Sequence, residues 1–179
     1  MGLVVHKDTR KSKITYVGGS LEGGLGPSSY LIEDQDSLGL IDLGLEFTKW
    51  PADTHPLTKL WYPKKVQGPV LLWKILNGRR IDWILVTHLH LDHAGGLPLA
   101  VEFLDPHAKI FADPITNAGL EIVLRDTLKF SPYMYDVFEV DNILRRRVDL
   151  PLGEYELVPG RKVFSKKAGH LLGALSFLF

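Results

Sequence analysis

Residues 81–96 have the sequence IDWILVTHLHLDHAGG, and this stretch decides the fold. Its first six residues, 81–86, are mostly β-branched, aromatic or otherwise apolar, which predicts a buried strand. Three histidines and one aspartate follow within six positions, directly where that strand should end. Proteins of the α/β class usually place their chemistry in loops at strand ends. The stretch therefore predicts an α/β fold with a polar functional site at the edge of a sheet.

The spacing of these polar residues has a physical logic. His88 and His90 are two positions apart, so both side chains point to one side of an extended segment. Asp92 and His93 follow where Ala94-Gly95-Gly96 turns the chain into a helix, and they can aim at a neighbouring point. Four nitrogen and oxygen donors around a small volume suit one or two divalent ions, zinc before others. The alternative is a polar loop in which Asp92 caps the helix and the histidines are solvated.

Composition narrows the class of protein. The chain has 179 residues, of which 45% are hydrophobic, and this allows one domain with a sizeable core. Its 21 basic and 21 acidic residues balance, so no global field attracts nucleic acid or an anionic membrane. It has no cysteine, and any metal site must therefore use His, Asp or Glu. No apolar run suits a signal peptide or a bilayer span, which predicts a cytoplasmic protein without a membrane partner.

The rest of the sequence predicts further strands and helices. A first strand over 13–17 leads into a glycine-rich loop over 20–27, which lacks the Gly-Lys-Ser/Thr of a phosphate-binding loop and is expected to be a turn. Residues 46–68 predict an irregular segment, and 105–107 predict the turn that ends a helix. The other expected strands are 28–33, 37–42, 109–112, 153–159, 162–167 and 175–179, and the expected helices are 70–76, 96–103, 114–128 and 133–147.

Two further polar features have alternative explanations. Asp42 ends an expected strand and precedes Leu43-Gly44, which is typical of a turn, but the same place suits a carboxylate that orients metal-binding histidines. The residues alone do not decide between these roles. Arg145-Arg146-Arg147 closes the last expected helix. These arginines could contact phosphate, but the pattern favours a solvated, cationic last turn that interacts with the helix dipole.

A second histidine segment lies far along the chain. Residues 168–173, Ala-Gly-His-Leu-Leu-Gly, follow the last of the internal strands, and an isolated Gly-His pair would ordinarily mean little. Here His170 would supply, from a distant loop, the third imidazole of a site begun by His88 and His90, because such sites are built from several loops. The alternative is a histidine that merely packs in the core.

Together these segments resemble the metallo-β-lactamase superfamily of metallohydrolases, and in detail its β-CASP branch of RNA- and DNA-processing nucleases. The resemblance runs over nearly the whole chain. Its specific parts are the second motif of the branch, at residues 88–98, and the third motif, at residues 168–173. The weaker parts are the opening Gly-Gly loop with its following strand, the first motif, and a helix between motifs, at residues 17–33, 40–44 and 124–129.

The sequence also departs from the pattern of that branch. It has Gly24-Leu25-Gly26 where the branch usually has Glu-Val-Gly, and Ala174 where a serine is common. It ends at Phe179, ahead of the family's fourth motif, an aspartate that bridges two metals, and of the inserted β-CASP domain. We therefore expect residues 1–179 to form a truncated metallo-β-lactamase domain, an αββα sandwich of which the first half and the start of the second are present.

The resemblance implies roles for the site residues. His88, His90 and His170 would hold one zinc ion, and Asp92 with His93 would begin a second site. Asp92 would also orient the nucleophile, and Asp42 would support the histidines, so both are expected to serve catalysis. In the full family two zinc ions share a hydroxide that attacks phosphorus in RNA or DNA. Without the bridging aspartate we expect one firmly bound ion and weak or no nuclease activity.

Other functions fit the same ligands. One is a small-molecule hydrolase of the superfamily, which would cleave thioesters or lactones. Another is a non-catalytic metal-binding or scaffold protein. The end of the sequence adds a separate expectation, because residues 175–179 predict an apolar strand with an unprotected edge. Such an edge invites pairing with another chain, and we expect self-association through it.

Overall fold

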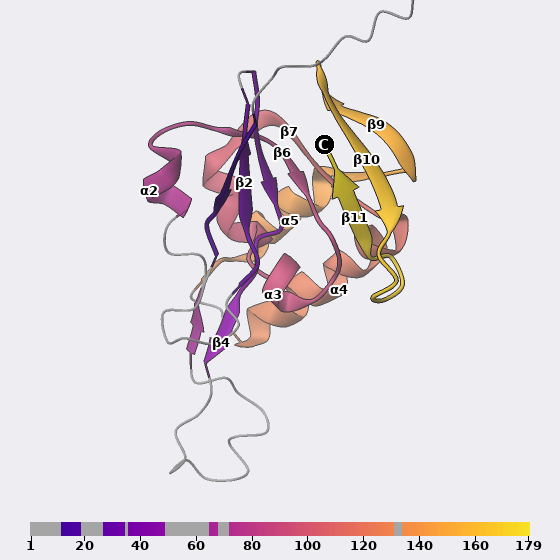
Figure 1. Cartoon of the computed structure of the whole chain (residues 1–179). Helices are drawn as coiled ribbons and strands as arrows, with labels where there is room; N and C mark the ends of the chain where they lie inside the picture. Colours follow the sequence, from indigo (N-terminus) through magenta and orange to yellow (C-terminus); the bar gives the residue numbers. More distant parts are fainter. Residues whose placement is uncertain (1–11, 19–26, 35, 49–64, 68–71, 131–133) are drawn as a thin grey trace, which may run out of the picture.

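The computed structural model describes residues 12–18, 27–34, 36–48, 65–67, 72–130 and 134–179 (Figure 1). Its centre is a six-stranded sheet in the order β1-β2-β3-β6-β7-β8. Strands β1, β2 and β3 are antiparallel neighbours, whereas β3, β6, β7 and β8 run parallel. In that order the strands span Lys13–Tyr16, Tyr30–Glu33, Leu38–Ile41, Ile81–Leu85, Leu104–Ala112 and Arg147–Asp149.

A second, three-stranded antiparallel sheet lies against one face of the central sheet, and helices cover the other face (Figure 1). Its strand order is β11-β10-β9, so β11 is an edge strand. These strands are β9 Gly153–Val158, β10 Arg161–Lys167 and β11 Leu175–Leu178. The helices are α2 Leu72–Leu76, α3 Leu91–Ala94, the 3-10 helix η1 Leu97–Phe103, α4 Pro114–Phe130 and α5 Val137–Arg145, and a small separate sheet pairs β4 Glu46–Thr48 with β5 Lys65–Gln67.

Strand β6 shows how the sequence makes these layers. Side chains of a strand alternate between the two faces of its sheet. Trp83 and Leu85 accordingly pack into the hydrophobic cluster between the two sheets, while Ile84 and Val86 pack into the cluster beneath the helices. All four are fully buried, which is why this strand is apolar at nearly every position. The expected α/β class is confirmed: a helix layer covers two packed sheets, and a small third sheet is formed by β4 and β5.

Two expectations about connections were wrong, and a third differs only in the type of helix. The sequence predicts a turn at 105–107, but these residues belong to β7, which pairs with β6 from Leu104 onward. The helix predicted over 96–103 is the 3-10 helix η1. The segment 46–68, predicted to be irregular, contains the paired strands β4 and β5. Short strands of this kind are specified by their partners, which lie far away in the sequence, and a local pattern does not reveal them.

The last helix is shorter than predicted. It begins at Val137 because Asp136 caps it: the Asp136 carboxylate accepts hydrogen bonds from two backbone N–H groups, and Glu139 completes a capping box. It ends before Arg147, which begins β8. Arg146 donates hydrogen bonds to backbone carbonyls within β7, at Asp105, Pro106 and Ala108. This arginine therefore ties the end of α5 to β7, whereas the sequence favoured a solvated last turn.

Some predictions concern parts of the chain outside the described residues. These are the glycine-rich loop, except for Pro27, and most of the segment between β4 and β5. Within the described part of the chain, every helix is too short or too polar to cross a membrane.

Candidate metal centre

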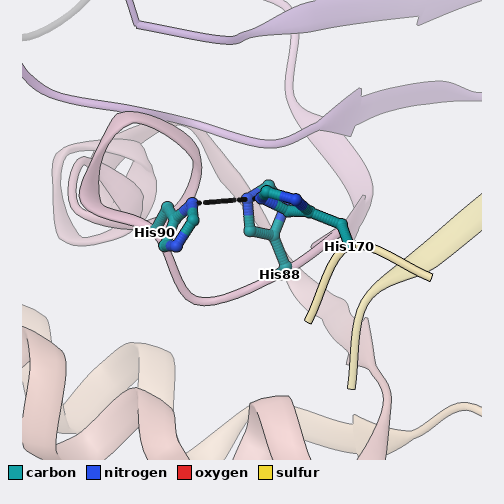
Figure 2. A group of neighbouring side chains, drawn as sticks. All are labelled: His88, His90 and His170. Carbon is teal, nitrogen blue, oxygen red and sulfur yellow. Dashed lines mark hydrogen bonds between the residues drawn. The ribbon is translucent and has the colours of Figure 1, made fainter. Parts of the chain in front are cut away.

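Three histidines meet beyond the end of strand β6 (Figure 2). His88 and His90 follow that strand directly, and His170 arrives from the connection between β10 and β11. The Nε2 atom of His88 lies 3.1 Å from Nδ1 of His90, and the Nε2 atom of His170 lies 3.4 Å from the same Nδ1. One potential ligand atom from each ring lies within 4.8 Å of the other two. The structure therefore brings together the three imidazoles that the sequence predicts.

The charge state of His88 suits the binding of a cation. His88 is buried, whereas His90 and His170 are exposed. Burial, together with the neighbouring histidines, lowers the pKa of His88 to about 4. Its ring is therefore neutral near pH 7, and the neutral imidazole is the form that binds a metal. Three imidazole nitrogens at one point, with His88 neutral, are a donor set that fits a divalent ion.

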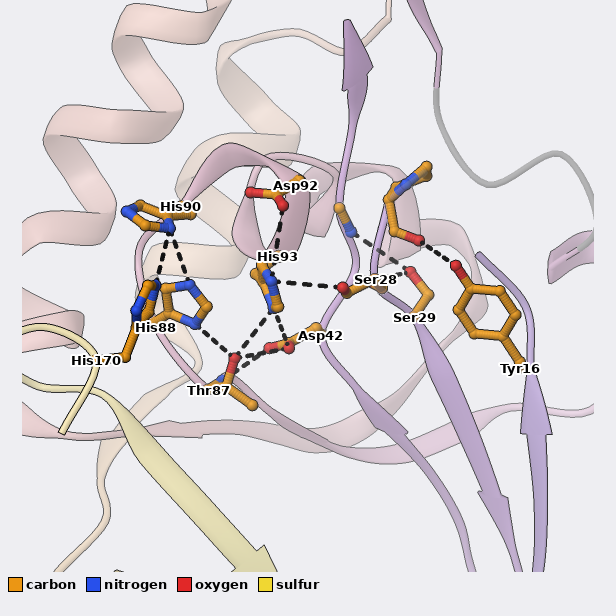
Figure 3. A network of polar contacts seen from close by, with 12 residues as sticks. Tyr16, Ser28, Ser29, Asp42, Thr87, His88, His90, Asp92, His93 and His170 are labelled. Carbon is orange, nitrogen blue, oxygen red and sulfur yellow. Dashed lines mark hydrogen bonds and ion pairs between the residues drawn. The ribbon is translucent and has the colours of Figure 1, made fainter. Parts of the chain in front are cut away.

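A buried carboxylate lies behind the histidines (Figure 3). Asp42 follows strand β3, has a left-handed backbone with φ of 58°, and its side chain is 2% exposed. Its carboxylate accepts three hydrogen bonds of 2.7 Å, from the backbone N–H of Thr87, the hydroxyl of Thr87 and Nδ1 of His93. Asp42 is thus at once a turn residue and a carboxylate that orients a histidine of the predicted site, so its two alternative roles coexist.

Asp42 and His93 alter each other's protonation. Burial raises the pKa of Asp42, and the three donors only partly offset this. Burial also lowers the pKa of His93, but the hydrogen bond and negative charge of Asp42 outweigh it, so the pKa of His93 lies above its ordinary value. Because Nδ1 of His93 is turned toward Asp42, its Nε2 faces the other way, toward Asp92.

Asp92 and His93 form a pair next to the three histidines (Figure 3). Nε2 of His93 lies 3.7 Å from Oδ2 of Asp92 and 3.4 Å from the hydroxyl of Ser28. The rings of His93 and His88 have centroids 4.1 Å apart. Asp92 is half-exposed and is not part of the group of His88, His90 and His170. The five residues predicted as ligands thus lie in two adjacent sets, one of three and one of two.

The backbone around Asp92 and His93 is held by the first motif. Leu43 donates its N–H to the carbonyl of His93, and Gly96 returns a hydrogen bond to the carbonyl of Leu43. A Cβ atom at Gly44 would lie 1.8 Å from the carbonyl oxygen of Asp92. The glycine of the Asp-x-Gly sequence is therefore required by the close approach of two backbones, which fixes helix α3 and its ligands against the end of β3.

Thr87 is a site residue to which the sequence analysis assigned no role. Its hydroxyl oxygen lies 2.9 Å from Nδ1 of His88 and 3.2 Å from Nδ1 of His93, besides its bond to Asp42. Its carbonyl accepts the N–H of Leu175, which begins β11 directly after the loop that carries His170. The sequence does show a hydroxyl residue at the end of a buried strand, immediately before the first histidine. It does not show which groups that hydroxyl would bind, because they come from other segments.

The fold and this arrangement define the class: a layered α/β protein with a cluster of histidines that could hold a metal at the end of a central strand. A profile of the metallo-beta-lactamase superfamily matches residues 23–153, and the chain belongs to that superfamily. Its fold is similar to that of a metallo-beta-lactamase from Cronobacter sakazakii, a HARLDQ motif mutant. The TM-score is 0.56 at 20% identity, over 92% of this chain and 55% of the other.

Curated relatives narrow the branch. Transcription termination factor FttA of Thermococcus kodakarensis is 25% identical over 174 residues, which cover 93% of this chain and 25% of that protein. RNase aCSPSF2 of Saccharolobus solfataricus is 27% identical over 167 residues, which cover 91% of this chain and 30% of that protein. The resemblance to the β-CASP branch is confirmed by these relatives. The chain spans about a quarter of the length of curated relatives such as FttA.

The coupling of Asp42 and His93 can be tested by Asp42→Asn. Asparagine has nearly the same shape and tolerates a left-handed backbone, but it carries no charge. We expect the pKa of His93 to fall below its ordinary value, because burial still lowers it while the negative charge that raised it is gone. NMR titration of the His93 ring protons in metal-free protein measures this. Asp126→Asn, on the exposed side of α4, is the control, and an unchanged His93 pKa in Asp42→Asn would contradict the coupling.

Proposed function

We propose that this chain binds a divalent metal ion, zinc in the first place, through His88, His90 and His170. The observation that carries the proposal is the meeting of these rings from two segments of the chain, with His170 lying 80 positions after His90. One potential ligand atom from each ring lies within 4.8 Å of the other two, which is close enough for all three to bind one ion. Three protein ligands with an open fourth position are the arrangement of a catalytic zinc site.

The donor set favours zinc over harder ions. All three donors are imidazole nitrogens, which suit zinc, copper, iron and nickel, whereas magnesium and calcium select oxygen. A bound zinc ion would supply Lewis acidity and a nucleophile at neutral pH, since it lowers the pKa of water from about 16 to about 7. Asp42 serves this site by holding Thr87 and His93 in place. The proposed role of Asp92 is to accept a proton from, or to orient, the attacking water; its Oδ2 lies 3.7 Å from Nε2 of His93.

We infer that the reaction is phosphodiester hydrolysis in a nucleic acid. The support is the class of the relatives, which include RNase aCSPSF2 and Endoribonuclease YSH1 of Mycosarcoma maydis. Because this chain spans about a quarter to a third of the length of FttA and aCSPSF2, we propose that it corresponds to the metal-binding portion of such a nuclease. Thioester or lactone hydrolysis uses the same ligands and is the alternative that a substrate comparison decides.

We propose that the chain alone holds one ion firmly and is a weak hydrolase. Asp92 and His93 provide two ligands for a second ion, and among the described residues the three histidines are the one group large enough to hold a metal by themselves. An ion with two protein ligands binds weakly compared with one that has three. Hydrolysis that needs two ions would therefore be slow at low metal concentrations. If no hydrolysis occurs, a non-catalytic scaffold function is the alternative.

Metal binding is tested by comparing two single-histidine variants. We expect wild-type protein to retain close to one zinc ion per chain after desalting, measured by elemental analysis. His170→Ala should lose affinity by more than the roughly 10- to 100-fold that loss of a ligand's hydrogen-bond partner costs, because a ligand itself is removed. His107→Ala removes another exposed histidine, in β7, and should bind like wild type. Two zinc ions per chain, or equal affinity in all three proteins, would contradict the proposed site.

Substrate class is tested with zinc-loaded protein. An RNA oligomer and bis(p-nitrophenyl) phosphate are compared with a thioester and a lactone. We expect slow hydrolysis of the phosphodiesters only, and its loss in His88→Ala. Faster cleavage of the thioester or lactone would show instead that the chain is a small-molecule hydrolase. No turnover of any substrate by protein that holds zinc would favour a non-catalytic role.

We also propose that the chain self-associates through β11. Among the described residues this strand has a neighbour on one side only, and the side chains of Leu178, its last residue, and Phe179, which follows it, are 70% and 45% exposed. An apolar edge strand with free backbone groups is a template for pairing with another chain. A second copy of the same strand, paired across a twofold axis, would satisfy both edges at once.

Leu178→Lys tests self-association by placing a charge on that edge. We expect wild-type protein to show concentration-dependent dimers in sedimentation velocity, and Leu178→Lys to remain monomeric, because a lysine on an edge strand opposes pairing. Ile122→Lys places the same charge on α4 at a side chain of similar exposure, 74%, and should dimerise like wild type. A wild-type chain that stays monomeric at high concentration would refute the proposal.

A further inference from the structure

We propose that the amino-terminal turn of α4, through Thr116 and Asp113, positions His170 for metal binding. The inference rests on the proposed metal site and deepens it, because it assigns positioning residues for the ligand that arrives from a distant segment. Neither residue lies in a motif of the metal centre. Their contacts with Gly173, in the loop between β10 and β11, and with Lys167, which leads into that loop, carry the argument.

His170 needs support from outside its own loop. Residues 168–170 and Leu172 of the loop are exposed, and Gly169 and Gly173 have left-handed φ values of 72° and 83°. A Cβ atom at Gly169 would meet nothing within 4 Å, so the chain is not packed there. The loop is closed at its base by a hydrogen bond from the N–H of Ala168 to the carbonyl of Ala174. Closure at the base fixes the two ends but does not by itself aim the imidazole.

The first contact from α4 is made by Thr116. This residue is fully buried, and its hydroxyl donates a 3.0 Å hydrogen bond to the carbonyl of Gly173. A Cβ atom at position 173 would lie 2.8 Å from that hydroxyl and 3.1 Å from the backbone nitrogen of Thr116. The glycine therefore lets the loop approach the helix, and the hydroxyl fixes the approach by binding a carbonyl group.

The second contact is made by Asp113. Its Oδ1 accepts the N–H of Ile115, which caps the start of α4, and its Oδ2 lies 2.8 Å from the ammonium of Lys167 at the end of β10. The Asp113 side chain is 5% exposed. Burial raises its pKa, but Lys167 and the capping N–H outweigh this, so the pKa of Asp113 lies below its ordinary value and the group is ionised. The same carboxylate thus ties the helix to the strand that leads to His170.

These two contacts bracket His170 evenly. Lys167 lies three positions before it and Gly173 three positions after it. Helix α4 is itself fixed in the core through Leu120 and Leu124, which are fully buried. The chain on both sides of His170 is therefore bonded to the start of one helix, α4. In this state the His170 ring has its centroid 4.8 Å from that of His88 and 5.1 Å from that of His90.

The test separates positioning from simple stabilisation of the hairpin. Thr116→Val keeps the shape of the side chain and removes the hydroxyl, and Thr116→Ser keeps the hydroxyl. Ser165→Ala is the matched control: Ser165 is buried in β10 and donates to the carbonyl of Pro151, so it stabilises the same hairpin without touching α4. Zinc affinity is measured by competition with a chromophoric chelator. Cross-relaxation between the ring protons of His170 and His90 is measured by NMR in metal-free protein.

We expect Thr116→Val to lower zinc affinity by about 10-fold or more and to weaken the His170–His90 cross-peak, as loss of an outer hydrogen-bond partner does at other metal sites. Thr116→Ser should restore both. Ser165→Ala should lower the melting temperature to a similar degree and leave both unchanged. If Thr116→Val does not fold, Lys167→Gln, at a half-exposed position, replaces it with the same expected result.

Two outcomes would overturn the inference: wild-type affinity and cross-peak in Thr116→Val, or an equal loss of both in Ser165→Ala. Failure of the proposed function is distinguishable from either. If wild-type protein binds no zinc, the metal site is refuted, and the cross-peak in the metal-free variants still decides whether α4 positions His170.

Discussion

The carboxylate of Asp42 joins the ends of strands β3 and β6 through hydrogen bonds to Thr87 and His93. It is buried, and a buried charge that loses its partner costs about 3–5 kcal/mol, so these contacts are strongly enforced. The positions of the candidate metal-binding histidines depend on these contacts. The histidines follow Thr87 along the chain, and β11 is bonded to the carbonyl of the same threonine. The buried carboxylate of Asp42 therefore fixes the place where the ends of β3 and β6 and the start of β11 meet.

Close approach of backbones is the second requirement of this frame. Gly44 and Gly173 each lie where a Cβ atom would collide with a neighbouring segment, one at the carbonyl of Asp92 and the other at Thr116. In both cases one of the two segments that come together carries a predicted ligand, Asp92 in the first and His170 in the second. Substituting either glycine would force two segments apart, whereas a ligand histidine can be replaced without moving the backbone. The glycines thus allow the segments to approach closely, and the histidines supply the nitrogen atoms that could bind a metal.

The sequence predicts a cluster of histidines, and the structure brings His88, His90 and His170 together as a group that could hold a metal. His88 and His90 lie in one stretch with the strand before them, whereas the prediction for His170 also used the family resemblance. The parts that the sequence did not reveal depend on partners from elsewhere. The strands β4 and β5 are defined by each other, β7 begins early because β6 extends beside it, and the roles of Thr87 and Thr116 follow from hydrogen bonds across the fold.

The three imidazoles are supported unequally, and this bears on how the centre would bind a cation. His88 is buried and bonded to Thr87, so its ring is fixed before any ion arrives. His90 is exposed but follows His88 on the same short segment. His170 depends on a loop whose aim is set from another layer of the protein, through α4. Ordering a loose ligand costs conformational entropy that is subtracted from the affinity. The strength of the site is therefore decided less by the histidine motif than by the contacts that keep its distant third member in place.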